Sequence, residues 1–420
     1  MCRLILKKFG DVMNESIKKK YARLIASVGV NIKKGQPVKI YCEADQYEFV
    51  TLLVNECYEA GASSVEVEWG WQAVTKLNYQ YKSLEDLSEV PVWQEEKLKL
   101  MVEKVPCRIY IESEDPYGLL GVDREKMQKS QTARYKITKK YSDALENKDQ
   151  WCIAAVPSYA WAQRVFPDET KEKAYEMLWE AILKTVYVTE DNDPEQAWKE
   201  HNADLKSRTA YLNGKKFDYL HYKSSNGTDF KASLIEESHW CGGGENTLSG
   251  NFFNPNLPTE EVFISPKKGF AEGKVVATKP LSWQSQIIDN FYIVFKDGKA
   301  VEWDAEIGKD LLDKMLSMDD GAKYLGELAL IPHDSPIANT GILFYNTLFD
   351  ENASCHVALG RGFCDTVDGF EEKSLEECQK LGINDSMIHV DFMIGAPDLE
   401  ITGYKNGEAT PIFRNGNWAF

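Results

Sequence analysis

The chain has 420 residues, of which 43% are apolar and 12% aromatic, and its formal net charge is −17. This length exceeds one ordinary hydrophobic core, so we expect two domains, and the apolar content excludes general disorder. The negative charge argues against partners that need a clustered basic field. We therefore expect no binding to nucleic acid or to an anionic membrane surface.

Nine cysteines are scattered along the chain without a CxxC pair. Such an odd number is typical of reduced thiols in the cytosol rather than of a disulfide framework. Residues 1–10 contain no small-residue cleavage site of a signal peptide, and no run approaches the roughly 20 apolar residues of a membrane span. We therefore expect a cytoplasmic protein.

The first half of the chain alternates helical and strand patterns. Apolar residues at positions 17, 21, 24, 25 and 28 mark one helical face, which Gly29 ends. PVKIYCEA (37–44) predicts a strand, Asp45 with Glu48 predicts a capping box for a helix that ends at Gly61, and SVEVEW (64–69) predicts the next strand. A strand, a helix and a strand in this order form a right-handed unit with parallel strands.

Two further strands are predicted in CRIYIES (107–113) and WCIAAVPS (151–158), with helices over 95–104 and 168–186. Residues 1–190 are therefore expected to form an α/β domain with a doubly wound, mostly parallel sheet. The charged, tryptophan-containing segment 191–213 predicts a helix that links this domain to the next.

Residues 214–420 show short strands and hairpins with few helices. The DG pair at Asp297 and the NG pairs at Asn406 and Asn415 mark tight turns, and helices are predicted chiefly over 309–316 and 319–324. The second domain is therefore expected to be α+β.

The most informative segment of this second domain is MIHVDFMIG (387–395), an apolar strand pattern with two polar residues. His389 and Asp391 lie two residues apart, so both side chains point to one face. A buried strand carries an imidazole and a carboxylate only with a charged partner, and we interpret that partner as a metal ion.

Other potential ligands lie in similar strand-like segments: Glu261 in PTEEVF, Glu327 in LGELALIP and His356 in ENASCHVALG. Carboxylate and imidazole ligands suit one or two divalent ions such as Zn, Mn, Co or Mg better than a thiolate site does. Cys355 precedes His356 on the opposite face of its strand, so the pair does not indicate a thiol protease. His333 is a further candidate for the pocket.

Four stretches of the chain together resemble the metallo-aminopeptidase family of aminopeptidase T, aminopeptidase S and PepS. They are NPNLPTEEVF, TKPL, DDGAKYLGELALIPHDSPIANTGILFYNTLFDENASCHVALG and IHVDFMIG. The resemblance extends from about Tyr21 to the C-terminus. It implies a metal-dependent aminopeptidase that hydrolyses the N-terminal peptide bond of peptides with a free N-terminus, with a dinuclear metal site. It also implies a homodimer whose paired chains enclose the active sites, with the first domain helping dimerisation.

The family's ligands fall on residues of this chain one by one. The glutamate of PTEEVF corresponds to Glu261, the bridging glutamate of the LGE motif to Glu327, and the histidine of CHVALG to His356. The HVDF motif supplies His389 and Asp391. Two divalent ions, drawn from Zn, Co, Mn or Mg, are thereby implied as cofactors.

Phe363 stands where the best-known members of the family have a ligating tyrosine, seven residues after the histidine of CHVALG. A phenyl ring cannot ligate a metal. The metal on that side is therefore expected to bind more weakly, to be completed by water, or to be served by Asp365 or Tyr345.

A dinuclear site suits peptide hydrolysis because two ions lower the pKa of a shared water and polarise the carbonyl. Glu327 is expected to be the catalytic carboxylate that both ions share. A general base must also move a proton from the water to the leaving amine. Glu260, which lies beside Glu261 on the opposite face of the strand, and Glu351 are both candidates, and the sequence does not separate them.

The segment 350–352, just before His356, is a candidate to supply the acceptor that fixes this imidazole, or else forms a simple turn. Two other interpretations of the whole chain stay open. One is a metallohydrolase with another specificity, such as a dipeptidase or a hydrolase of a different amide. The other is a non-catalytic homologue that binds a metal or a ligand, which the phenylalanine at position 363 favours.

Overall fold

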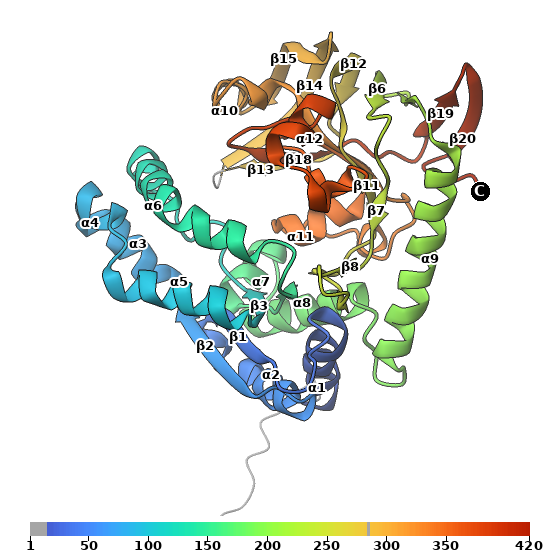
Figure 1. The fold of residues 1–420 in the computed structure, drawn as a ribbon. Coiled ribbons are helices and arrows are strands. Elements are labelled where there is room, and N and C mark those ends of the chain that lie inside the picture. Colours follow the sequence, from blue (N-terminus) through green and yellow to red (C-terminus); the bar gives the residue numbers. More distant parts are fainter. Residues whose placement is uncertain (1–14, 284–285) are drawn as a thin grey trace, which may run out of the picture. The chain divides into compact units, whose positions relative to one another are not determined.

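The computed structural model describes residues 15–283 and 286–420 (Figure 1). The predicted absence of a signal peptide concerns residues 1–10, which lie outside the described residues. The chain divides into two compact units, Met1–Glu200 with Gly244–Pro258 and His201–Gly243 with Thr259–Phe420. The boundary therefore falls inside helix α9 (Pro194–Lys215), whereas we expected boundaries at residues 190 and 213.

The first unit contains a five-stranded parallel sheet with the strand order β10, β4, β3, β1, β2. Its strands are β1 (Pro37–Glu43), β2 (Ser64–Gly70), β3 (Cys107–Glu112), β4 (Trp151–Ala155) and β10 (Asn256–Leu257). The four longer strands and the α/β fold are as predicted. Strand β10 is not among the predicted strands because two residues are too few to show a period of two. Strands β8 (Glu245–Asn246) and β9 (Phe252–Phe253) form a separate pair.

The helices of the first unit agree with the predicted alternation, but one predicted helix start is wrong. Helix α2 begins at Tyr47 after a 3-10 turn, and its N-cap residue Gln46 makes no side-chain capping bond. The Asp45 carboxylate accepts a hydrogen bond from the side-chain amide of Gln46 at 3.2 Å instead of capping the helix with Glu48. The helical segments are α1 (Glu15–Leu24), the π-helix η1 (Ile25–Gly29), η2 (Ala44–Gln46), α2 (Tyr47–Glu59), α3 (Gln72–Tyr81), α4 (Leu84–Ser88), α5 (Val92–Lys104), α6 (Arg124–Leu145), α7 (Tyr159–Val165) and α8 (Lys171–Thr185).

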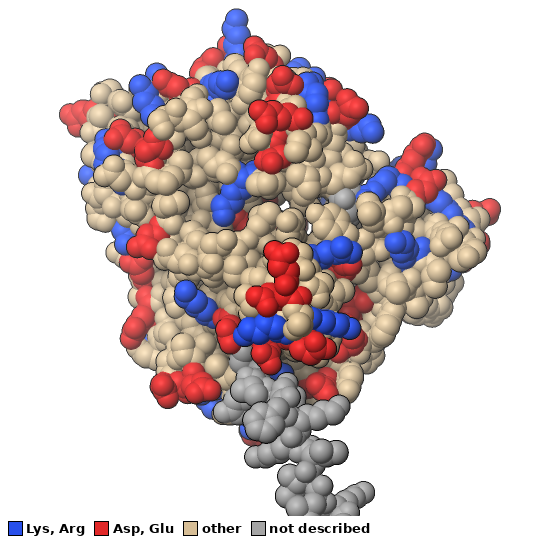
Figure 2. All heavy atoms as spheres, turned by 180° about the vertical axis from the view of Figure 1, so that it is seen from behind, with Lys and Arg blue, Asp and Glu red and all other residues tan. Residues whose placement is uncertain are grey.

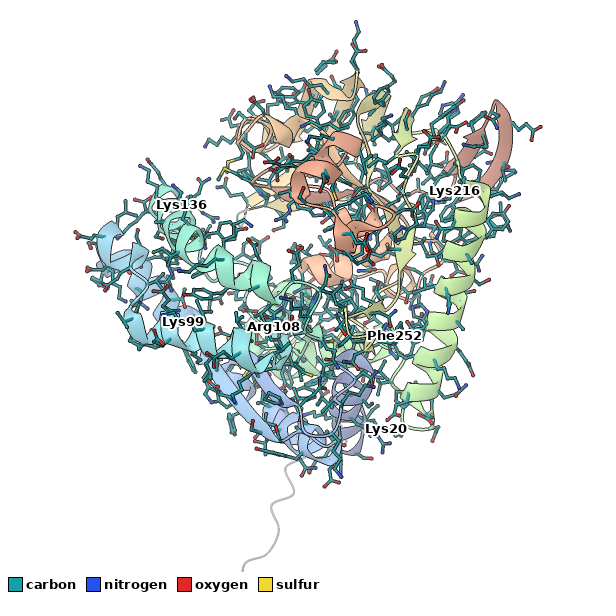
Figure 3. The ribbon with its side chains drawn as sticks, viewed as in Figure 1. Lys20, Lys99, Arg108, Lys136, Lys216 and Phe252 are labelled. Atoms are coloured by element: carbon teal, nitrogen blue, oxygen red, sulfur yellow. The ribbon has the colours of Figure 1, made fainter. Side chains whose placement is uncertain are left out.

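Helices α3 to α6 extend from this sheet as an arm (Figure 1), on which Figure 3 labels Lys99 of α5 and Lys136 of α6. Helices α3, α4 and α5 contain no buried residue. Large apolar side chains of this segment are exposed, among them Trp71, Tyr81 and Trp93. These three helices thus have no apolar core of their own.

The second unit contains two antiparallel sheets. The larger has the strand order β13, β14, β12, β6, β5, β19, β20, β21, and β15 pairs with β14. The predicted tight turns at Asp297, Asn406 and Asn415 are confirmed, since each residue has a positive φ between two paired strands. The strands are β5 (Tyr219–Lys223), β6 (Asp229–Leu234), β12 (Pro266–Val276), β13 (Leu281–Trp283), β14 (Gln286–Lys296), β15 (Lys299–Ile307), β19 (Glu400–Lys405), β20 (Glu408–Arg414) and β21 (Asn417–Trp418).

The smaller sheet has the order β18, β17, β16, β11, β7. Its strands are β7 (Cys241–Gly242), β11 (Val262–Ile264), β16 (Leu325–Leu330), β17 (His356–Gly360) and β18 (His389–Met393). Residues of both sheets share one apolar core, to which this sheet contributes Leu328, Val357 and Phe392. Because alternate residues of a strand point to opposite faces, residues 327, 356 and 391 lie on the face away from that core.

Helix α10 (Lys309–Leu316) is as predicted, but the predicted helix over 319–324 is wrong. The structure has only a 3-10 turn, η3 (Gly321–Lys323), at this place. The Asp319 carboxylate accepts hydrogen bonds from the Ala322 N–H and the Ser386 hydroxyl, both at 2.8 Å, and so stabilises a turn in place of a helix. The remaining helical segments are η4 (Ala338–Thr340), α11 (Thr347–Asp350), η5 (Glu351–Ala353), η6 (Cys364–Thr366), η7 (Phe370–Glu372) and α12 (Leu375–Leu381).

Among the described residues, no helix is both long and apolar enough to cross a membrane. On the face drawn in Figure 2, basic side chains lie among acidic ones rather than in a field of their own. The expected cytoplasmic localisation and the expected absence of nucleic-acid binding stay predictions.

Candidate metal centre

Strand register brings the ligand candidates together on three neighbouring strands. Glu327 on β16 pairs with Ala358 on β17, and Ala358 pairs with Asp391 on β18. These three side chains therefore lie in one row across the sheet, and the small Ala358 leaves space between two carboxylates. His356 and His389 lie two residues away along β17 and β18, so they share this face.

Glu261 joins the set from the end of a fourth strand. It directly precedes β11, whose Val262 pairs with Leu330 of β16. Because successive residues of a strand point to opposite faces, the side chain of Glu261 points to the face that carries Glu327 if this pairing continues by one residue. The site is well shielded from solvent, since the exposed fractions of the Glu261, Glu327 and His356 side chains are 12%, 5% and 1%.

Backbone carbonyls orient both imidazole rings. Nδ1 of His356 lies 2.9 Å from the carbonyl oxygen of Glu351, and Nδ1 of His389 lies 2.6 Å from that of Arg361. A carbonyl oxygen only accepts, so each Nδ1 carries the hydrogen and donates it. Each Nε2 therefore faces the carboxylates, as it must in a neutral imidazole that ligates a metal.

The candidate ligand atoms form two groups that overlap. Nε2 of His389 is 3.2 Å from the Glu327 carboxylate and 3.3 Å from that of Asp391. Nε2 of His356 is 3.5 Å from the Glu261 carboxylate. Two groups of three ligand atoms result, each within 4.8 Å of one another, namely Glu261, Glu327 and His356, and Glu327, His389 and Asp391. The structure thus brings all five ligand candidates together, with Glu327 in both groups.

Burial and close charges shift the pKa values of these groups. Burial raises the pKa of Glu261 to about 8, and the neighbouring Glu327 adds to the rise. Burial by itself lowers the pKa of His389, but Asp391 and Glu327 raise it well above its ordinary value. Burial tends to raise the pKa of Asp391, but His389 and then His356 outweigh it and lower that pKa. Protons thus offset part of the negative charge of the cluster.

The donor set fits divalent cations. Oδ1 of Asp391 is buried and, within residues 15–283 and 286–420, has no hydrogen-bond partner of good geometry. A buried carboxylate oxygen without such a partner costs free energy, which a bound cation offsets. Carboxylate oxygens together with imidazole Nε2 atoms are the donors that Zn, Mn and Co take in proteins.

Phe363 lies directly beside one of the ligands. The centroid of its ring is 4.7 Å from that of the His389 ring, at an interplanar angle of 47°, and 5.5 Å from that of Phe263. The phenyl group therefore occupies a place next to His389 without offering a donor atom. Asp365 belongs to neither group of ligand atoms, and a role for Tyr345 stays a prediction.

The two candidates for the general base have different neighbours. The buried Glu260 has its carboxylate 3.9 Å from His201 and belongs to neither ligand group. Burial of the Glu351 carboxyl raises its pKa well above the ordinary value, and the charges of Asp391 and Glu261 add to the rise, although Glu351 also belongs to neither ligand group. His333 is exposed and belongs to neither group.

Three supporting contacts hold the candidate site, and two of them, those made by Arg361 and Asn352, are absent from the sequence-based prediction. The acceptor that fixes His356 lies in the predicted segment 350–352 and is the backbone carbonyl of Glu351, while Arg361 supplies the corresponding carbonyl for His389. The side chain of Asn352 accepts a hydrogen bond from the Glu260 N–H at 2.8 Å. Backbone acceptors have no side-chain signature, so a sequence pattern does not reveal them.

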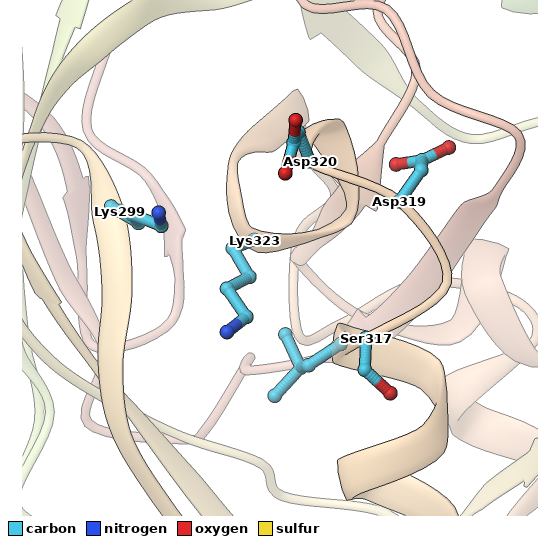
Figure 4. Close-up of a pocket in the computed structure, with 6 residues that line it drawn as sticks. Lys299, Ser317, Asp319, Asp320 and Lys323 are labelled. Atoms are coloured by element: carbon cyan, nitrogen blue, oxygen red, sulfur yellow. The ribbon is translucent and has the colours of Figure 1, made fainter.

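A cavity of about 440 Å³ lies elsewhere in the second unit (Figure 4). It is lined by Lys299, Leu316, Ser317, Asp319, Asp320 and Lys323. None of the ligand candidates lines it, and the Asp319 carboxylate already accepts hydrogen bonds from the Ala322 N–H and the Ser386 hydroxyl. We therefore assign no catalytic role to this cavity.

Known proteins resemble this chain over nearly its whole length. The family described as thermophilic metalloprotease (M29) matches residues 14–418. Aminopeptidase AmpS of Bacillus subtilis (strain 168) is 42% identical, over 95% of this chain and 98% of that protein. Aminopeptidase 2 of Geobacillus stearothermophilus is 40% identical, over 96% and 97%. The structure of wild-type AmpT from Thermus thermophilus matches with a TM-score of 0.89 at 36% identity, over 97% of this chain and 100% of that one.

The chain therefore belongs to the thermophilic metalloprotease (M29) family, a class of metal-dependent hydrolases. The predicted family, the predicted fold class and the prediction of a metalloprotease are confirmed. Membership of this family implies a divalent metal cofactor, for which the two ligand groups are the candidate site.

Proposed function

We propose that this protein is an aminopeptidase that hydrolyses the N-terminal peptide bond of peptides at a dinuclear metal centre. The observation that carries the proposal is that two groups of ligand atoms share one carboxylate, Glu327. A shared carboxylate is the arrangement expected where two ions lie close enough to act on one water. The names of the relatives, both aminopeptidases, support the substrate class.

Glu261, Glu327 and His356 would hold one divalent ion, and Glu327, His389 and Asp391 the other. Bound Zn, Co, Mn or Mg would supply Lewis-acid chemistry, which lowers the pKa of a water and polarises the scissile carbonyl. The protein contributes the spacing set by Glu327 and the imidazole orientation set by two carbonyls. It also contributes a shielded face on which charge interacts strongly.

We assign the proton carrier to Glu351 rather than to Glu260. Hydrolysis requires a group that takes a proton from the attacking water and gives it to the leaving amine. Burial first, and then the charges of Asp391 and Glu261, raise the pKa of Glu351 and so let this carboxyl hold a proton, whereas Glu260 lies beside His201. Glu351→Gln should therefore lower kcat at least about 100-fold, while Glu260→Gln should keep most of it.

The test uses metal-stripped full-length protein with each divalent metal added back. Aminoacyl chromogenic amides, their N-acetylated counterparts, dipeptides and longer peptides serve as substrates. Metal-restored cleavage of the free amides and longer peptides, without cleavage of the acetylated ones, supports the proposal. Cleavage of dipeptides alone would identify a dipeptidase instead. Tight metal binding without turnover would identify a non-catalytic homologue.

We also propose a homodimer, to which the arm of the first unit contributes. Tyr81, Val92 and Trp93 are 78%, 75% and 68% exposed, and they lie on helices without buried residues. Soluble monomers rarely expose many large apolar side chains on one segment, and a second copy of the chain is the partner we propose for them. Light scattering should give twice the chain mass for the wild type, and Trp93→Glu should shift it toward the monomer.

A further inference from the structure

Glu261 is the one ligand candidate that no strand holds directly. Glu327, His356, His389 and Asp391 lie inside paired strands, whose ladder hydrogen bonds fix their backbone. Glu261 lies in the segment 258–261 between β10 and β11, so something other than a strand ladder must fix its backbone.

Asn352 makes the contact that fixes the backbone of the Glu261 segment. Its side chain is fully buried, and its Oδ1 accepts the backbone N–H of Glu260, the residue before Glu261, at 2.8 Å. Its Nδ2 donates to the carbonyl of Leu348 at 3.0 Å and lies 3.4 Å from the Glu351 carboxylate. This one amide therefore links the Glu261 segment to the turn formed by α11 and η5.

The same turn also orients a second ligand. The carbonyl of Glu351, next to Asn352, accepts the Nδ1 hydrogen of His356. Glu261 and His356 belong to one ligand group, so a single turn holds both of the ligands that this group does not share with the other. The sheet register alone does not couple them in this way.

We propose that Asn352 is a positioning residue for the metal group of Glu261, Glu327 and His356. The inference rests on the proposed function, because it presumes that this group binds a metal. Without the amide, the buried N–H of Glu260 loses its acceptor, and the loop that carries Glu261 moves to find another. Loss of a supporting contact of this kind typically weakens metal affinity about 10–100-fold.

Stepwise titration of Zn²⁺ into metal-stripped full-length protein, against a chromophoric chelator, tests the proposal. The wild type should show two binding steps. Asn352→Ala should weaken one step by at least about 10-fold and change the other by less than about 3-fold, because the hydrogen bonds that the Asn352 side chain makes in the described part of the chain go to Glu260, Leu348 and Glu351 and not to His389 or Asp391. Thermal unfolding of the metal-free variant shows whether it is folded.

Asn213→Ala is the matched control. The side-chain amide of Asn213 also fixes a backbone segment, since it accepts a hydrogen bond from the Trp240 N–H at 2.7 Å and donates one to the Trp240 carbonyl at 3.2 Å. None of the candidate metal ligands takes part in these bonds. Its loss should lower the unfolding temperature and leave both zinc affinities unchanged. If Asn352→Ala does not fold, Asn352→Ser serves in its place, because a short hydroxyl cannot bond Glu260 and Leu348 together.

The outcomes separate the two proposals. Two unchanged zinc affinities in the folded Asn352 variant, beside a wild type that binds two ions, would overturn the positioning role and leave the proposed function intact. A wild type that binds no zinc, manganese or cobalt would overturn the proposed function and this inference with it. A loss of affinity of the same size in Asn213→Ala would show that the effect is general destabilisation, and would also overturn the inference.

Discussion

Each of the two units places charged side chains on the face of a sheet, and the two sets differ in their charge balance. In the first unit, Lys39 and Lys97 lie between Glu66 and Glu68, with the closest pair, Lys39 and Glu68, at 2.8 Å. Two cations thus meet two carboxylates, and the carboxylate side chains are 62% and 43% exposed. This set is neutral and partly hydrated.

The candidate metal centre in the second unit has no such balance. Four carboxyl groups, those of Glu261, Glu327, Glu351 and Asp391, face only two imidazoles. Burial first, and then the uncancelled charge of Glu327, favour the protonated form of Glu261 and raise its pKa to about 8. Charged groups on a sheet therefore indicate a ligand only where their charges fail to cancel.

The largest effect is expected from Glu327→Gln. The substitution keeps the shape of the side chain but removes the charge that both ligand groups share. Loss of a supporting contact already costs about 10–100-fold in activity, so loss of this ligand should lower kcat by more than about 100-fold. Turnover of the metal-loaded variant, with circular dichroism as the folding control, measures this. A kcat near that of the wild type would contradict the shared role of Glu327.

The next effect concerns pH. In metal-free protein, the raised pKa values of Glu261 and His389 mean that the folded state keeps protons which the unfolded chain releases. The contribution of these groups to the free energy of unfolding is fully present below about pH 4.5 and is lost as the pH rises through about 8. Metal-free protein should therefore unfold at a lower temperature at pH 8 than at pH 5.

Metal binding should displace the same protons. As the pH increases, zinc affinity should therefore increase by about tenfold per pH unit for each proton released. Calorimetry in buffers of different ionisation enthalpy counts these protons. An affinity independent of pH between 5 and 8 would show that the ligands are already deprotonated.

A smaller effect is expected from Phe363→Tyr. The ring lies against His389, so a phenol at this place can add an oxygen to the group of Glu327, His389 and Asp391. The metal concentration for half-maximal activity should fall about threefold to tenfold. Phe263→Tyr, on the neighbouring ring, is the control and should leave it unchanged. Two equally tight sites in the wild type, unaltered in the variant, would show that another residue supplies the ligand.

The smallest effect is expected from Lys39→Met in the balanced set of the first unit. Its carboxylate partners reach solvent, so they are hydrated when the cation is removed, and the free energy of unfolding should fall by only about 1 kcal/mol. Urea unfolding measures this, and zinc affinity should not change. A large loss of metal binding in this variant would mean that the two sets of charges are coupled.

The sequence by itself determined the alternation of the first unit, the hairpins of the second and the residue types of the metal centre. Long strands such as β1 and β3 can be recognised in the sequence by their period of two and their composition. The NG and DG turns can be recognised because they need a positive φ. His389 and Asp391 were identifiable because charged groups rarely stand in an apolar strand without a partner. The family motifs supplied the remaining ligands and their order.

Only the tertiary structure decided which of these groups act together. Strand register aligned Glu327, Ala358 and Asp391, and register depends on pairing between segments far apart in the chain. The same applies to the turn at Asp319, which a side chain 67 residues away stabilises in place of a helix. The choice between Glu260 and Glu351 likewise depended on their neighbours, because the free energy of a buried carboxyl is set by the charges around it and not by its place in the sequence.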